Sequence, residues 1–279
     1  MTAAPGRRAL VATRMSGRRL GLMLLPAALL FTCVASPCRA QEMQVKVAVF
    51  EFNDLSGYAG HVLGARAAAR MQVELRDSGR FTMVPRADVR RECAALDLKP
   101  PFAVGYQQQV LSRLGAILSL TGTLRSCRID AKSATASVTM VAELSELAGG
   151  EQVAILKATG VAQGDRKKPV AADVLVEEAL ATAGREITRS LTAGTQVKGK
   201  LVSASAEGQK ITVDADAGTA FVAGMKALLY HRKDDGTWGY AGLAGIEAAD
   251  KTAAQGKVLS ARGDLKEGDL VVGIFGGAR

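Results

Sequence analysis

KVAVFEFNDLSG, residues 46–57, is the stretch around which the rest of the chain is arranged. Its apolar side chains occupy both alternating faces, with Val47 and Val49 on one face and Ala48 and Phe50 on the other. Such a run is typical of an interior strand that is covered on both sides. The polar turn NDLSG then leads into a long helical stretch, which is how an α/β layer begins.

The first forty residues predict a secretory signal peptide. They contain six arginines, no acidic residue and an apolar run, residues 20–34, that is short for a membrane span. The sequence CRA at 38–40 places small residues at the two positions that a signal peptidase reads, so we expect cleavage after Ala40. Met15 is an equally good start of the chain, because a complete signal opening follows it.

The cysteines of this leader argue against a lipoprotein. Bulky Phe31 stands where a lipobox before Cys33 needs a small residue, and Pro37 directly precedes Cys38. The expected location is therefore the periplasm or the cell exterior, reached through a cleavable leader. Any association with the outer membrane or the cell wall would be peripheral.

The charge of the chain comes mostly from the leader. The full sequence has 36 basic and 27 acidic residues, a net charge of +9. Cleavage would remove six basic residues and no acidic ones, which leaves a net charge near +3 over 239 residues. This balance gives no support for nucleic-acid binding.

Periodicity predicts a mixed α/β domain over residues 41–192. Leu63, Ala67, Met71 and Leu75 recur every four residues and predict an amphipathic helix. Helices are expected at 60–77, 86–98, 103–114 and 171–191, and strands at 46–52, 81–84, 117–127, 134–144 and 153–161. The last two strands should pair as an antiparallel hairpin with one solvated face.

Helical periodicity disappears after residue 192, which marks a second domain over residues 195–279. Short strands separated by Gly and Asp turns take its place. They are expected at 196–203, 210–214, 226–232, 238–248, 255–261 and 270–275. Spacing of this kind predicts a small all-β barrel or sandwich.

No catalytic, metal-binding or cofactor-binding set is expected. His61 and His231 are the only histidines and fall in different predicted domains, so a metal site or a Ser-His-Asp relay would need both domains. Gly57, Gly60 and Gly64 are not spaced as in a dinucleotide-binding loop and more readily serve a turn and close helix packing. The sequence therefore predicts a protein that is not an enzyme.

Two cysteines, Cys93 and Cys127, would remain after cleavage. Each shares a face with apolar neighbours, which is typical of a buried thiol. A disulfide between them could also form in the compartment that the leader predicts. The sequence leaves both states open.

Tyr230, Trp238 and Tyr240 form the one aromatic concentration in the mature chain. Aromatic side chains on a small barrel could bind a partner protein or a glycan, and they could equally pack its core. They are the candidate partner-binding residues of the sequence.

Three blocks of the first domain, KVAVFEFNDLSG, SGRFTMVPR and GAILSLTGTLRS, resemble the curli-secretion (CsgG-type) family and the related amino-terminal domain of the Tol-system propeller protein. The resemblance covers about Val45 to Leu191. It implies an anticodon-binding-like mixed α/β domain used in envelope assembly or secretion, with no catalytic residues.

The tail resembles the carboxy-terminal domain of flagellar assembly protein T. The resemblance rests on GKLVSASAEGQKITVDADAGTAFVAGMKALLYHR and on GDLKEGDLVV near the end. It implies an SH3-like barrel.

These features favour a non-enzymatic envelope protein that docks in a secretion or surface-appendage apparatus. Open strand edges and Ala-rich helix faces would be its contact surfaces for assembly proteins or for further copies of the chain. One alternative is a CsgG-type secretion-channel subunit or accessory. Another is a cell-wall or glycan binder that acts through the barrel.

Overall fold

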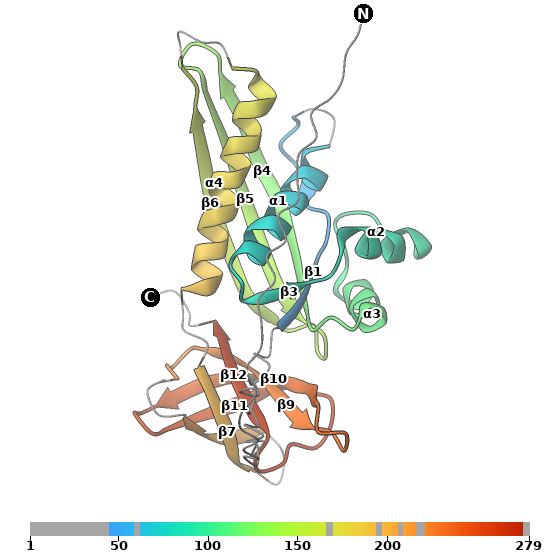
Figure 1. Cartoon of the computed structure of the whole chain (residues 1–279), viewed down its shortest axis with the longest axis vertical. Helices are drawn as coiled ribbons and strands as arrows, with labels where there is room; N and C mark the ends of the chain where they lie inside the picture. The colour runs from blue at the N-terminus through green and yellow to red at the C-terminus, as the bar shows by residue number, and fades with distance from the viewer. Residues whose placement is uncertain are drawn as a thin grey trace, which may run out of the picture. The chain divides into compact units, whose positions relative to one another are not determined.

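The computed structural model describes residues 45–58, 62–165, 170–193, 197–205, 209–215 and 221–275. They form a mixed α/β part followed by an all-β barrel (Figure 1), and both belong to one packing unit, Met43–Arg279. The predicted leader and His61 lie outside the described residues.

The α/β part is built on a six-stranded sheet in the order β3-β1-β4-β5-β6, with β2 paired to β4. The strands are β1 (Val45–Val49), β2 (Asn53–Asp54), β3 (Phe81–Met83), β4 (Leu118–Asp130), β5 (Thr135–Glu146) and β6 (Gln152–Gln163). β1 runs parallel to β3 and β4, whereas β4, β5 and β6 are antiparallel. The sheet is therefore parallel at one end and antiparallel at the other.

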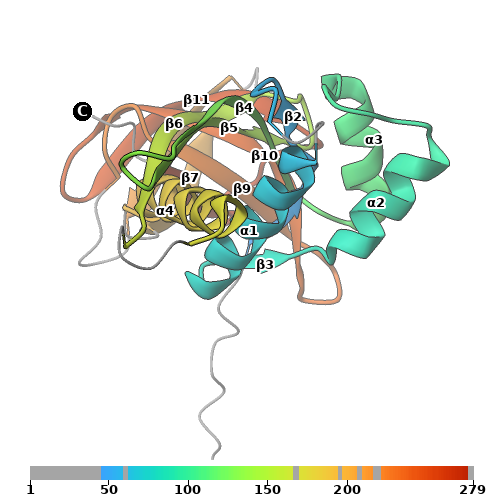
Figure 2. The same cartoon turned by 90° about the horizontal axis from the view of Figure 1, so that it is seen from above.

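Four helices pack on this sheet: α1 (Leu63–Asp77), α2 (Arg86–Ala95), α3 (Val104–Leu114) and α4 (Ala172–Thr192). In Figure 2, α1 and α4 lie together on one face of the sheet, and α2 and α3 lie apart from them as a separate pair. Helix α2 is shorter than predicted, because Asp97 has a positive φ of 49° just after its end.

Both faces of β1 are covered, as its sequence predicts. Val45, Val47 and Val49 belong to the core that contains the buried residues of α1 and α4. Ala48 and Phe50 point the other way, into the core that contains those of α2 and α3. The interior-strand prediction is confirmed.

The end of this first strand is held by a close approach between backbones. The Phe52 N–H donates to the Gly64 carbonyl oxygen at 3.4 Å. A Cβ atom at Gly64 would lie 2.1 Å from the Phe52 carbonyl oxygen, so only glycine fits there. Gly64 therefore serves helix packing, as expected, because it lets α1 begin directly against the strand.

α4 lies equally close to the hairpin of β5 and β6. A Cβ atom at Gly160 on β6 would lie 1.9 Å from the carbonyl oxygen of Ala179 and 2.5 Å from the nitrogen of Ala183. Small side chains on both elements keep the two backbones near one another. This contact fixes which face of the hairpin is buried.

The second part is a closed antiparallel barrel in the order β10-β11-β8-β7-β12-β9. Its strands are β7 (Val197–Ala204), β8 (Lys210–Ala215), β9 (Lys226–Arg232), β10 (Trp238–Ala249), β11 (Ala253–Ala261) and β12 (Leu270–Phe275). The barrel has its own core, which includes Leu201, Val213, Leu229 and Val271. Each strand lies within two residues of its predicted position.

No helix within the described residues is both long enough and apolar enough to cross a bilayer.

Adding one methyl group at Gly160 tests the contact between α4 and β6. We expect Gly160→Ala to lower the free energy of unfolding by about 1–3 kcal/mol, because the methyl group overlaps the α4 backbone. Gly105 on α3 has open space where its Cβ would lie, so Gly105→Ala should leave stability unchanged or raise it by up to about 1 kcal/mol. Urea unfolding measures both, and equal effects would contradict the close contact.

Candidate functional site

The antiparallel end of the sheet is covered on one face only. On β5, Val138, Met140 and Ala142 are buried in the core shared with α4, and the residues between them are polar or half-buried. The register of β4, β5 and β6 aligns the outward side chains of all three strands. We call this surface the open face; it includes Thr121, Thr123, Ser137, Thr139, Val141, Glu143, Ile155, Lys157, Thr159 and Val161.

Short hydroxyl side chains and a few aliphatic ones make up most of the open face. The hydroxyl oxygens of Thr139 and Thr159 are 2.9 Å apart and join β5 to β6. Ile155 and Val161, both on β6, are 54% and 56% exposed. Large aliphatic side chains on a flat, largely neutral surface suit contact with another protein segment.

β6 is also the last strand of the sheet, and none of the strands that the structure describes lies beside its outer side. Such an edge presents unpaired backbone N–H and C=O groups, and natural proteins usually shorten it or place charges or proline on it. β6 is 12 residues long, and its sequence QVAILKATGVAQ contains no proline and one charge, Lys157. The opposite edge strand, β3, has three residues. The β6 edge is therefore long and weakly protected.

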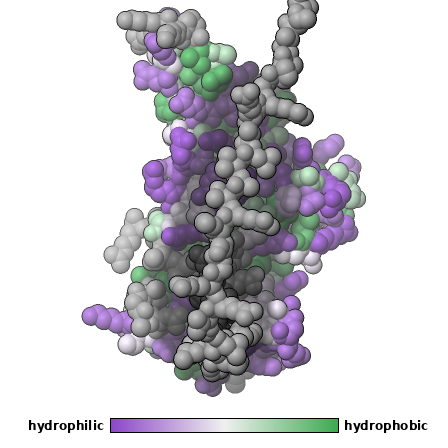
Figure 3. Space-filling view, viewed as in Figure 1, coloured by the Kyte–Doolittle hydropathy of each residue, from purple (hydrophilic) through white to green (hydrophobic). Residues whose placement is uncertain are grey.

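The alanines of α4 do not form an exposed surface. Ala179, Ala181 and Ala183 are buried, and Ala172, the first residue of the helix, is exposed. Hydrophilic side chains predominate among the described residues on the face shown in Figure 3. The expectation that Ala-rich helix faces are contact surfaces is wrong for α4, because its alanines provide the close approach to β6.

The three predicted partner-binding aromatics differ in their exposure. Tyr230 on β9 is 2% exposed, and its ring packs edge-on against that of Tyr240 on β10, with centroids 6.0 Å apart. Trp238 is 39% exposed. Of the three side chains, Trp238 is exposed, Tyr240 is half-buried and Tyr230 is buried.

Tyr240 instead connects the barrel to the sheet through a buried carboxylate. Its hydroxyl donates to Oε2 of Glu146 at 2.6 Å, and Glu146 is 1% exposed. The same carboxylate accepts the N–H groups of Ala148 and Gly149 in the turn after β5. Burial, and then the hydrogen bond to Glu146, raise the pKa of the Tyr240 phenol above its ordinary range.

Sequence reasoning missed Glu146, although one signal was present. Glu146 follows Leu144 on the buried side of β5 and directly precedes the turn Ala148-Gly149-Gly150. An acid that continues an apolar face needs partners in the fold, and backbone N–H groups of a tight turn are natural ones. Its partner from the barrel could not be read from local sequence.

Cys93 and Cys127 are free thiols in this structure. Cys93 belongs to the core that contains Ala48 and Phe50, whereas Cys127 packs against the core on the other face of the sheet. Burial raises the pKa of the Cys93 thiol to about 11, and it also raises that of Cys127. The structure thus presents the buried-thiol state and not the disulfide.

The remaining titratable groups suggest structural roles. His231 Nδ1 lies 3.0 Å from Oδ1 of Asp269, whose Oδ2 accepts the N–H of Lys266 in the turn before β12. Among the described residues, no group of three or more His, Cys, Asp or Glu side chains is arranged to hold a metal ion.

No family model and no curated protein sequence matches this chain. Among solved structures, it is similar to a PelC dodecamer from Paraburkholderia phytofirmans, with 16% identity over 52% of this chain and 86% of that one and a TM-score of 0.36. It is also similar to the LpoB C-terminal domain from Salmonella enterica, with 18% identity over 43% of this chain and 83% of that one and a TM-score of 0.32. A third similar structure is lipoprotein GNA1162 from Neisseria meningitidis, with 12% identity over 47% of this chain and 90% of that one and a TM-score of 0.36. TM-scores this low carry no argument about fold or function, and the two family resemblances stay predictions.

Alkylation distinguishes the two states of the cysteines. In a chain that begins at Gln41, we expect both thiols to react with iodoacetamide, and Cys93 to react at least about tenfold more slowly than Cys127 near pH 8 because it is buried and little ionised. Peptide mass spectrometry measures the two rates. A native mass lower by two hydrogens, with no alkylation before reduction, would show a disulfide instead.

A double-mutant cycle measures the bond between Glu146 and Tyr240. Because a buried hydrogen bond to a charged group contributes about 1.5–3 kcal/mol, Tyr240→Phe and Glu146→Gln should be coupled by about that amount in urea unfolding. Tyr106→Phe, at an exposed tyrosine, is the matched control and should have no effect. Additive effects of the two substitutions would mean that the bond does not stabilise the fold.

Proposed function

We propose that this chain is a non-enzymatic protein of the bacterial envelope that acts as a docking or assembly factor in a secretion or surface-appendage apparatus. The leader over residues 1–40, with cleavage after Ala40, would deliver it to the periplasm or the cell exterior. There its partners would be assembly proteins or further copies of itself.

The observation that supports this proposal is the combination of the open face with the β6 edge. An extended segment of a partner can add to such an edge as a further strand, which gives affinity through backbone hydrogen bonds and specificity through side-chain contacts. The exposed side chains of Ile155 and Val161 stand beside this edge and would contact the added strand. A surface of this kind binds a partner and supplies no reacting group.

We further propose that residues 41–192 form an anticodon-binding-like domain of the CsgG type, and that residues 195–279 form an SH3-like barrel of the flagellar assembly protein T type. The three sequence blocks that resemble the CsgG-type family provide β1, β3 and most of β4, the parallel part of the sheet. The tail block and the closing GDLKEGDLVV provide strands of the closed barrel. These placements support the assignment to two domains.

A charge at the β6 edge tests the docking role in cells that make the protein. Val161→Lys places a charge on this edge, which disfavours strand addition, and it should shift the chain from a large native complex to the size of a free monomer. Val174→Lys on α4 is the matched control, because Val174 is 54% exposed, and it should keep the complex. Size-exclusion chromatography of gently solubilised envelopes, with immunodetection, measures the shift.

Two results would overturn the proposal. One is a Val161→Lys variant that still elutes with the full-size complex. The other is a wild-type chain that is recovered from the cytosol or runs only as a free monomer.

A further inference from the structure

Two adjoining pockets lie where the α2–α3 pair meets the sheet, at the end of the open face that contains Thr121, Thr123 and Glu143. The first has a volume of about 240 Å³ and the second about 480 Å³. They share Glu51, Pro100 and Phe102, which stand between them. A ligand that passes over these three residues would enter both pockets.

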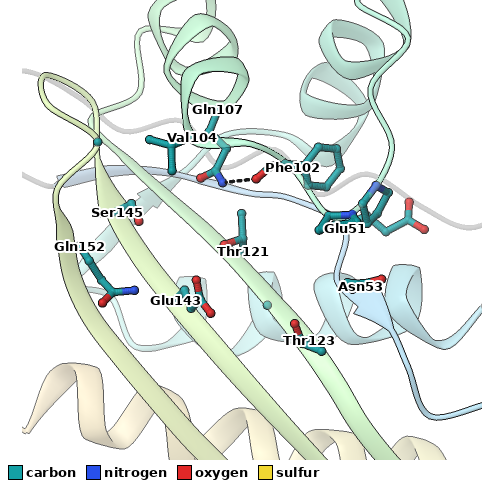
Figure 4. Close-up of a pocket in the computed structure, with 14 residues that line it drawn as sticks. Glu51, Asn53, Phe102, Val104, Gln107, Thr121, Thr123, Glu143, Ser145 and Gln152 are labelled. Atoms are coloured by element: carbon teal, nitrogen blue, oxygen red, sulfur yellow. Dashed lines mark hydrogen bonds between the residues drawn. The ribbon is translucent and has the colours of Figure 1, made fainter.

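The first pocket is acidic. Figure 4 shows Glu143 entering it from the sheet, with Glu51 on the other side beside Phe102. Among the described residues, the other polar groups around it are neutral, such as Thr121, Thr123 and Gln152, and none that lines it is a lysine or arginine. This pocket is suited to a cationic group, and we call it the acidic pocket.

The second pocket is basic. Arg86 and Arg90 lie one turn apart on α2, and Lys99 lines the same pocket, where these three basic side chains outnumber the carboxylates of Glu51 and Asp97. Within the described residues no carboxylate lies within 4 Å of either arginine's guanidinium, although Arg91 next to them pairs with Asp88 at 2.9 Å. Burial lowers the pKa of Arg86, repulsion from Arg90 lowers it further, and Glu51 acts in the opposite direction. We call this the basic pocket.

The wall between the pockets is held in place by the core. The Phe102 ring packs on Phe50, with centroids 5.2 Å apart. The Phe102 carbonyl accepts a hydrogen bond from Nε2 of Gln107 at 2.8 Å (Figure 4), and Oε1 of Gln107 accepts one from the Ser119 hydroxyl at 2.9 Å. The two charged pockets are therefore kept at a fixed separation before any ligand arrives, which lowers the entropy cost of binding.

We propose that the paired pockets bind a short dipolar peptide segment, with a lysine or arginine side chain in the acidic pocket and a nearby carboxylate in the basic pocket. Charge complementarity selects this ligand, because a singly charged segment would match the excess charge of one pocket only. The apolar side chains of Val89 and Leu98 line the basic pocket and would contact the stem of the acidic residue. The site adjoins the first residue of β6, Gln152, whereas Val161 lies near the other end of that strand.

Blocked peptides with one lysine and one aspartate separated by glycine, in both orders, are the test ligands. Peptides in which alanine replaces the lysine, the aspartate or both are their controls. Titration into ¹⁵N-labelled chain beginning at Gln41, followed by amide chemical shifts, measures each dissociation constant. We expect at least one doubly charged peptide to shift the amides around Glu51 and Phe102, and to bind about five- to tenfold more tightly than either singly charged one, as one retained ion pair would give.

Three variants assign the ends of the peptide. Glu143→Gln should abolish the tighter binding that the lysine of the peptide provides and keep the tighter binding that the aspartate provides. Arg90→Gln should abolish the contribution of the aspartate and keep that of the lysine. Arg91→Gln, one residue away but paired to Asp88 and outside the pocket, should change nothing. The native amide spectrum of each variant shows that it is folded.

The proposal is overturned if no peptide shifts these amides, if singly charged peptides bind as well as doubly charged ones, or if Arg91→Gln weakens binding as much as Arg90→Gln. Competition by inorganic phosphate with equal affinity would also overturn it, since the basic pocket would then be a simple anion site. Val161→Lys should leave peptide binding unchanged. A negative result in the peptide titration therefore leaves the docking role untouched, and loss of the docking role leaves the peptide site untouched.

Discussion

The structure depends on one constraint: β1 has strands on both sides and apolar side chains on both faces. Its valines must be covered by one layer of helices, and Ala48 and Phe50 by another. Both faces must be shielded from water, because each large apolar side chain left exposed would lower the stability of the fold by about 1.5–3 kcal/mol. Helices therefore cover both faces of the sheet: α2 and α3 lie against Ala48 and Phe50, and α1 and α4 lie on the face of the valines.

β5 and β6 are under the opposite constraint. Their side chains alternate between buried and solvated, so one helix is enough to cover them. α4 supplies that cover, and the other face stays open. The open face and the unpaired β6 edge thus follow from the same residue pattern that closes the core, while the two charged pockets lie near the transition between the doubly covered and singly covered regions.

The sequence predicted most of the elements because their signals are local. The two-residue period located β5 and β6, the four-residue period located α1 and α4, and Gly and Asp turns marked the barrel strands. Arrangements that depend on distant residues were missed. The burial of Tyr230, the bond between Glu146 and Tyr240 over 94 positions, and the pairing of β2 with β4 all require the folded chain. The sequence therefore left open whether the aromatic cluster binds a partner or packs the core, and in the fold Tyr230 is buried.

The close backbone approaches at Gly64 and Gly160 have a consequence for how such a sequence diverges. Valine, isoleucine, leucine and alanine can exchange at many core sites with small losses, provided that the volume is compensated nearby. At these two glycines no exchange can be compensated by a neighbouring side chain, because the atoms in the way are main-chain atoms. Evolutionary drift should therefore erase the apolar blocks first, and a pair of glycines, one at the start of the first helix and one in the last strand of the sheet, would be the most lasting mark of common descent.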